Sequence, residues 1–111
     1  MRAMDEQGAI TALAALAQQL RLRIYRTLVG AGPQGITPGQ LAALLEVPAS
    51  TLSFHLKELV RAGLVQAERE GRHLIYRPAI EQMNAVIAYL TDHCCQGEDC
   101  GVTRPPVRVS C

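Results

Sequence analysis

The stretch from Pro48 to Pro78, PASTLSFHLKELVRAGLVQAEREGRHLIYRP, changes its hydrophobic period halfway along, and this change decides the fold. In its first half, apolar residues recur at three- and four-residue steps, as on one face of a helix, at Leu52, Leu56, Leu59 and Val60. Gly63 is the expected helix stop. In its second half, apolar and polar residues alternate, as in paired strands, with the apolar ones at Val65, Ala67, Leu74 and Tyr76. Glu70 and Gly71 mark the turn, so a helix followed directly by a β-hairpin is predicted.

A second, shorter helix is predicted just before this stretch, in TPGQLAALLEV. Thr37 can cap its start, and Pro38 suits the first helical position. Its apolar edge consists of Leu41, Leu44 and Leu45, and Pro48 closes it. Two helices joined by so short a connection are typical of a helix-turn-helix, and a hairpin that follows one directly is called a wing.

Further helices are predicted on both sides of this unit. The residues from Ala9 to Val29 have a helical pattern, whose apolar positions include Ile10 and Leu13, with a weak break near Gln18 to Arg21. From Ala79 to about Cys95 a last helix has apolar positions at Ile80, Met83, Ile87 and Leu90. The predicted fold is therefore mainly α with a β-hairpin, a winged helix-turn-helix with an additional helix at each end. We expect residues 1–100 to form this domain and residues 101–111, which include two prolines, to form a flexible C-terminal tail.

The bulk composition describes one globular domain and excludes several other classes. The chain has 111 residues, of which 49% are hydrophobic and 19% charged, and its net charge of +1 does not by itself indicate a partner. The start, MRAMDEQGAI, has acids where a signal peptide needs an apolar core. No apolar run approaches the roughly 20 residues that a bilayer requires. We therefore expect a cytoplasmic protein with no membrane partner and with reduced thiols.

The second helix of the helix-turn-helix has the features of a recognition helix. With Leu52 in the core, the opposite side and its flanks carry short polar groups near the start, Ser50, Thr51 and Ser53, which suit base edges. Lys57 and Arg61 lie further along and suit phosphates. Phe54 either packs on a neighbouring loop or contacts a thymine methyl group, and both interpretations stay open. His55 is either a hydrogen-bonded structural histidine or a DNA contact.

The hairpin tip supplies the remaining candidate contacts to double-stranded DNA, Arg69, Arg72 and His73, which can reach the minor groove or the backbone. Between Ser50 and Arg77 five lysines and arginines stand against three glutamates. This mild excess is typical of a DNA binder that relies on a dimer, although such charges can also merely solvate a surface.

The stretch STLSFHLKELVRAGLVQAEREGRHLIYRP, together with LRLRIYRTL upstream, resembles the DNA-binding core of the ArsR/SmtB family of metal-sensing repressors. The shared elements are Ser-any-His-Leu, Ala-Gly-Leu-Val and Glu-Gly-Arg, in register. The resemblance covers roughly Ala9 to Cys100. It implies a homodimeric winged helix with N- and C-terminal dimerisation helices, which binds operator DNA when empty and leaves it when an inducer binds. It implies no enzymatic activity and no organic cofactor.

The sequence departs from the family at the inducer sites. Arsenic repressors of the best-known kind carry cysteines on the first helix of the helix-turn-helix, whereas QLAALLEV has none. Zinc-sensing members often use spaced Asp, His and Glu pairs on the last helix, and here Asp92 and His93 lack a second pair. If the protein senses an ion, another site must hold it.

The four cysteines, Cys94, Cys95, Cys100 and Cys111, all lie in the last eighteen residues, which indicates a site rather than a disulfide framework. Cys94 continues the apolar spacing of the last helix and can be a small buried hydrophobe, which leaves Cys95 unexplained. Gly97 permits a return of the chain, so Cys94, Cys95 and Cys100 can converge on a soft ion. As(III) or Sb(III) as inducer fits three thiolates best.

Other interpretations of the cysteine cluster remain open. Lead also accepts three sulfurs, whereas zinc and cadmium favour a fourth ligand such as His93 or Cys111. A thiol redox switch is the main alternative, and an incidental cluster is a third. A small thiol enzyme is not expected, because no cysteine pair has the two-residue spacing of an oxidoreductase motif. The hypothesis is thus an arsenite- or antimonite-responsive repressor, with a redox-responsive or Cd/Pb/Zn-sensing one as the alternative.

Overall fold

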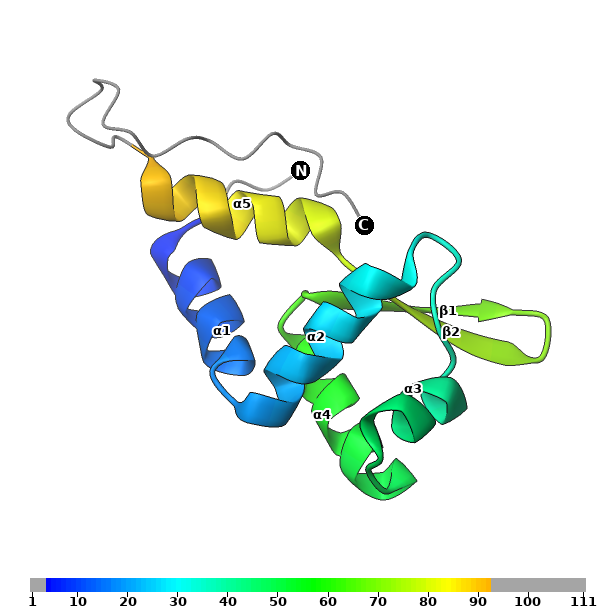
Figure 1. Ribbon diagram of the computed structural model, residues 1–111. Coiled ribbons are helices and arrows are strands. Elements are labelled where there is room, and N and C mark those ends of the chain that lie inside the picture. Colours follow the sequence, from blue (N-terminus) through cyan, green and yellow to red (C-terminus); the bar gives the residue numbers. More distant parts are fainter. Residues whose placement is uncertain (1–3, 93–111) are drawn as a thin grey trace.

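The computed structural model describes residues 4–92 and consists of five helices and one two-stranded sheet in this range (Figure 1). In chain order the elements are α1 (Glu6–Leu16), α2 (Gln19–Ala31), α3 (Pro38–Leu45), α4 (Ala49–Arg61), β1 (Val65–Glu70), β2 (His73–Pro78) and α5 (Ile80–Thr91). This order confirms the winged helix-turn-helix with an additional helix at each end.

The long helical pattern near the start is divided into two helices, as the weak break predicted. Gln18 has an extended backbone, and its side-chain oxygen accepts a hydrogen bond from the Arg21 backbone N–H at 2.8 Å, which caps α2. Asp5 caps α1 in the same way, through the Gly8 N–H at 2.7 Å. The chain therefore turns at Ala17 and Gln18, and α2 packs against both α1 and α4.

The helix-turn-helix is built from α3 and α4. Thr37 and Gln40 form a reciprocal capping box at the start of α3, which satisfies two backbone donors that the helix itself leaves unpaired. The α3 helix ends at Leu45, three residues before the proline that the sequence marked as its limit, because Glu46 adopts a left-handed conformation with φ of 55°. The α4 helix then starts at Ala49 with Pro48 as its N-cap.

The wing is an antiparallel hairpin that is fixed to the body of the protein at its base. Backbone hydrogen bonds of 3.2 and 2.9 Å join Ile36, in the α2–α3 loop, to Tyr76 of β2. Gly35 makes this approach possible: its φ is +74°, and an added Cβ would collide with the side chain of Ile75. The loop before the helix-turn-helix thus runs beside β2.

The hydrophobic core contains few large side chains of the terminal helices and leaves others exposed to solvent. Its largest fully buried side chains come mainly from α2, α3 and α4, with one from α5: Ile24, Leu28, Leu41, Leu52, Leu56, Leu59, Leu64 and Val86. The α1 helix contributes only its small residues Ala9 and Ala12 to the buried set, whereas Ile10 and Leu13, which belong to the predicted apolar pattern, are 51% and 41% exposed. Val60 of the predicted α4 stripe is also partly exposed.

The last helix is shorter than the sequence predicted. It ends at Thr91 instead of continuing to about Cys95, because the backbone of Asp92 is extended. The Thr91 hydroxyl donates back to the carbonyl of Ile87 at 2.9 Å, which satisfies one of the last carbonyls of the helix. In α5, Val86 faces the core, and Leu90 is 58% exposed.

The approach of the loop to the wing gives a test of the fold. Gly35→Ala should lower the free energy of unfolding by about 1–3 kcal/mol, because the positive φ and the collision with Ile75 both oppose a Cβ. The matched control is Gly39→Ala in α3, where an added Cβ meets nothing within 4 Å. It should raise the free energy of unfolding by about 0.5–1 kcal/mol. Urea denaturation of both variants measures the difference, and equal effects would contradict the close approach.

Candidate nucleic-acid interface

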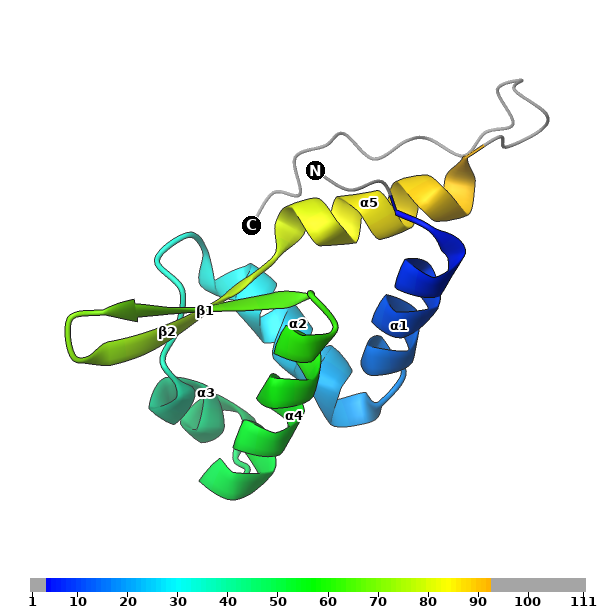
Figure 2. The same ribbon diagram turned by 180° about the vertical axis from the view of Figure 1, so that it is seen from behind.

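The α4 helix presents a polar face to solvent. Its core side is fixed by three leucines that are at most 1% exposed, Leu52, Leu56 and Leu59. The candidate base and phosphate contacts on its other faces are all exposed, and these are Ser50, Thr51, Ser53, Phe54, Lys57 and Arg61. In both views the start of α4 lies at the end of the molecule opposite α5 (Figures 1 and 2). The helix can therefore enter a groove without obstruction from the terminal helices.

Phe54 is 58% exposed, and its ring lies edge-on to the ring of His55, with 5.2 Å between the centroids. This position leaves most of the phenyl ring available to an apolar partner such as a thymine methyl group. The contact with thymine itself stays a prediction.

His55 makes a contact within the fold that sequence reasoning could not assign. Its Nδ1 lies 3.2 Å from Nη1 of Arg21, and Nε of the same arginine donates to the Ala15 carbonyl at 2.6 Å. Because an arginine can only donate, Nδ1 must accept, so the ring is neutral with its proton on Nε2. His55 thus has a hydrogen-bond partner within the fold, as its structural interpretation requires. A contact of its Nε2 with DNA stays a prediction.

The surroundings of His55 also determine its charge. Partial burial lowers the pKa of His55 below its ordinary value of 6.5, and the positive charge of Arg21 lowers it further. The carboxylate of Glu58 acts in the opposite direction. The ring is therefore kept in the neutral form that the contact with Arg21 requires.

The wing carries its candidate contacts at the tip. Arg69, Arg72 and His73 are all exposed around Gly71, which has a φ of +65°. The pairing of Arg69 with Leu74 and of Glu70 with His73 places Arg69 and His73 on opposite faces of the hairpin. Either face of the tip can thus present a cation or a hydrogen-bond donor.

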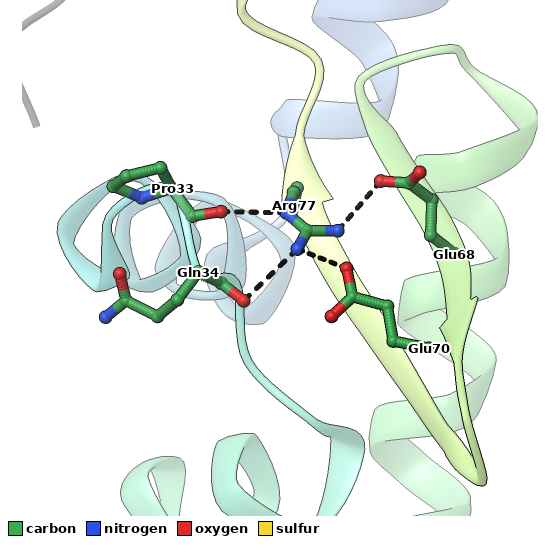
Figure 3. A network of polar contacts seen from close by, with 5 residues as sticks. All are labelled: Pro33, Gln34, Glu68, Glu70 and Arg77. Carbon is green, nitrogen blue, oxygen red and sulfur yellow. Dashed lines mark hydrogen bonds and ion pairs between the residues drawn. The ribbon is translucent and has the colours of Figure 1, made fainter.

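Two of the five basic residues between Ser50 and Arg77 are already paired. Arg61 lies 3.3 Å from Glu58 on α4, in an exposed ion pair. Arg77 contacts Glu68 at 2.7 Å and Glu70 at 2.6 Å, and its hydrogen bond to Glu70 is the main cause that raises the pKa of Arg77 (Figure 3). The signal for the Arg77 contacts was present in the two-residue period of the strands, which places Glu68, Glu70 and Arg77 on one face.

The thiols of the proposed inducer site, Cys94, Cys95 and Cys100, lie outside the described residues, as do Cys111 and His93. Within residues 4–92, no group of three His, Cys, Asp or Glu side chains is arranged to hold a metal ion. In the same range, none of the helices combines the length and the hydropathy needed to cross a lipid bilayer.

Comparisons with known proteins agree with this architecture. The domain family described as "Helix-turn-helix domain" matches residues 16–66. The transcriptional regulator YgaV from Escherichia coli is 32% identical over 95 residues, which cover 86% of this chain and 93% of YgaV. The structure of HlyU from Vibrio cholerae has a TM-score of 0.64 at 32% identity, over 84% of this chain and all of HlyU. HlyU also has a structure described as reduced.

A further structure connects the fold to a named family and to an assembly. The homodimeric winged helix-turn-helix DNA-binding domain Mb0332 from Mycobacterium bovis, described as a possible ArsR-family transcriptional regulator, has a TM-score of 0.61. It is 26% identical, over 88% of this chain and 96% of that domain. The chain belongs to the ArsR/SmtB family. It is therefore a DNA-binding transcriptional regulator of the winged-helix type, and its relatives are regulators rather than enzymes.

The contact between Arg21 and His55 predicts how the stability of this ArsR/SmtB-family regulator depends on pH. Folding lowers the pKa of His55 below its ordinary value of 6.5. At pH values just below 6.5 the unfolded chain therefore binds more protons than the folded chain does. The contribution to stability is thus present above pH 6.5 and is lost as the pH falls below it. His55→Gln should flatten the decline of the free energy of unfolding between pH 7.5 and pH 5, as measured by urea denaturation. His73→Gln, on the exposed wing, should keep the slope of the parent, and an unchanged slope in His55→Gln would contradict the assignment.

Proposed function

We propose that the chain is a homodimeric repressor that binds operator DNA and leaves it when As(III) or Sb(III) binds Cys94, Cys95 and Cys100. The observation that carries the DNA-binding part is the exposed polar face of α4 beside a wing with a basic tip. Two such units related by a two-fold axis would place their α4 helices in successive major grooves of an inverted repeat. Ser50, Thr51 and Ser53 would contact base edges, and Lys57 and Arg61 would contact phosphates.

The exposed apolar side chains of the terminal helices support the dimer. Ile10 and Leu13 on α1, and Tyr89 and Leu90 on α5, are 38–58% exposed, and the two helices are in contact with each other. Single exposed apolar residues are common, but four large ones on two helices in contact favour burial against a partner. A second copy is the natural partner, since a two-fold interface uses the same surface of both subunits. The homodimeric relative supports the same assignment.

The position of the cysteines suggests how the inducer would act. The α5 helix ends at Thr91, three residues before Cys94, so a site built from Cys94, Cys95 and Cys100 would directly follow a helix of the proposed interface. Three thiolates suit As(III) and Sb(III), which form strong bonds to sulfur. Closing the segment around the ion would shift or stiffen the end of α5 and change the spacing of the two α4 helices. Ion and DNA would then oppose each other's binding, by about 1–3 kcal/mol.

A redox-responsive regulator is the second candidate, because HlyU, a relative named as a transcriptional activator, has a structure described as reduced. In that case oxidation of the same cysteines would replace the binding of an ion. Peroxide would release the DNA, and arsenite would not. Zinc or cadmium sensing would instead require a fourth ligand such as His93 or Cys111.

The inducer site is tested with Cys95→Ser and, as matched control, Cys111→Ser. The probe is a labelled duplex that the parent protein selects from a random-sequence pool, and binding is followed by fluorescence anisotropy. Both variants should bind the duplex like the parent. Arsenite should release the parent and Cys111→Ser, whereas the apparent affinity of Cys95→Ser should change less than about twofold, against a parent shift of about fivefold or more.

The other outcomes of this experiment are equally informative. Release of Cys95→Ser at the arsenite concentration that releases the parent would contradict the assignment of the ion site. Release by peroxide alone would favour the redox candidate. If no duplex is selected, the DNA-binding proposal itself fails.

The dimer interface is tested with Leu90→Glu and, as control, Leu44→Glu on α3, where the leucine is 63% exposed. Leu90→Glu should convert the protein to a monomer, because the dimer would bury a carboxylate against its two-fold partner. Leu44→Glu should leave the dimer intact. Sedimentation equilibrium measures both masses, and a Leu90→Glu protein with the mass of the parent dimer would exclude this part of α5 from the interface.

A further inference from the structure

Arg77 holds together three segments of the chain at the base of the wing. Its Nη1 donates to Glu68 at 2.7 Å and its Nη2 to Glu70 at 2.6 Å, and both acceptors belong to β1 (Figure 3). On its other side, Nε donates to the Pro33 carbonyl at 2.9 Å, and Nη2 also donates to the Gln34 carbonyl at 3.3 Å. The guanidinium thus connects both strands of the hairpin to the α2–α3 loop.

These contacts use the particular geometry of an arginine. A guanidinium has five N–H donors in a fixed plane, and Arg77 directs donors to two carboxylates on one side and two carbonyls on the other. Its side chain is only 21% exposed, although both glutamates are more than half exposed. A lysine at this position has one compact ammonium group, which cannot span the same four acceptors.

The network lies on one face of the hairpin, and the candidate DNA contacts lie around its tip. The register places Glu68, Glu70 and Arg77 on the same face, whereas Arg69 is on the other face and Arg72 is in the turn. The pairing with Arg77 offsets one of the two negative charges that would otherwise repel phosphates close to Arg69 and Arg72. It also fixes the base of a hairpin that two strands alone would hold weakly.

We infer that Arg77 is a positioning residue for DNA binding, which does not touch the nucleic acid but sets the angle at which the wing presents Arg72. The inference rests on the DNA-binding part of the proposed function. The α2–α3 loop leads directly into α3, so the same contacts fix the wing relative to the helix-turn-helix. The wing and α4 then reach one duplex as a single rigid surface.

The test is a double-mutant cycle between Arg77→Lys and Arg72→Ala, measured by anisotropy on the duplex that the full-length parent selects. Arg77→Lys keeps the charge and should still weaken binding by about threefold or more, because the wing is no longer held. Arg72→Ala in the parent should reduce the slope of log affinity against log salt by about one for each phosphate that the protein no longer neutralises. In the Arg77→Lys background it should cost at least about twofold less than in the parent.

Two further variants separate positioning from charge and from general stability. Replacing Glu68 and Glu70 together by Gln removes two negative charges from each subunit and weakens the hold on Arg77, yet the preference for the selected duplex over a scrambled one should fall. Arg61→Met removes a paired arginine from α4 instead, and its effect should add to that of Arg72→Ala, because the two residues lie on different elements. Circular dichroism of each variant confirms that it folds.

Each result decides the question. Additive effects of Arg77→Lys and Arg72→Ala, with a normal salt slope in the single Arg77 variant, would overturn the inference while leaving the proposed function intact. A preference for the selected duplex that rises with the glutamine variant would assign Arg77 a charge role only. If the parent selects no duplex, the proposed function fails first, and the two failures are therefore distinguishable.

Discussion

The burial of one leucine face of α4 is the constraint on which the rest of the structure depends. Leu52, Leu56 and Leu59 are almost fully buried in a core cluster that includes residues of α2 and α3, and this packing determines which side of α4 faces water. A rotation of the helix by one residue, about 100°, would carry these leucines out of the core and would turn toward it either Ser53 and Lys57 or Thr51 and His55. The hydrophobic core therefore orients the polar face, and no contact with a ligand is needed to do so.

The terminal helices show the opposite situation, in which the core of one chain does not account for the apolar residues. Small alanines of α1 face inward, and the larger Ile10 and Leu13 face outward, while Leu90 is exposed on α5. Small residues allow α1 to lie close to the body of the protein, so its larger residues remain available for another surface. A domain of this size buries a limited part of its surface, and a second copy would provide the remaining burial.

The sequence predicted those elements of the fold in which the apolar residues follow a single helical or strand spacing. The helix α4, the antiparallel hairpin and the break before α2 were confirmed, although burial does not alternate along the strands: in β1 only Val65 is buried, and Ala67 is exposed. Periodicity could not show that Ile10 and Leu13 are exposed, because a helix face that meets a second subunit has the same pattern as one that meets its own core. The end of α5 depends on the backbone of a single residue, Asp92, which no pattern specifies.

The sequence predicted which residues lie on the exposed face of α4, but it did not predict which side chains they contact within the fold. Ser50 to Arg61 follow from the helical period once Leu52 is placed in the core. The contact of His55 with Arg21 joins residues 34 positions apart, and nothing in the local sequence indicates it. The contacts of Arg77 are encoded in the strand period, but only the register of the hairpin shows that both glutamates lie within reach.

The charges of the interface explain why the assembly matters for recognition. Because Arg61 and Arg77 form ion pairs, the cations of α4 and the wing that carry no ion pair within residues 4–92 are Lys57, Arg69 and Arg72. With Arg61, whose ion pair to Glu58 is exposed, a monomer could release counterions from about four phosphates and a dimer from about eight, and affinity at cellular salt depends steeply on that number. A change in the spacing of the two α4 helices would remove half of these contacts together. In the proposed dimer, a small displacement at the interface would therefore have a larger effect on binding to DNA than a displacement of one α4 helix alone.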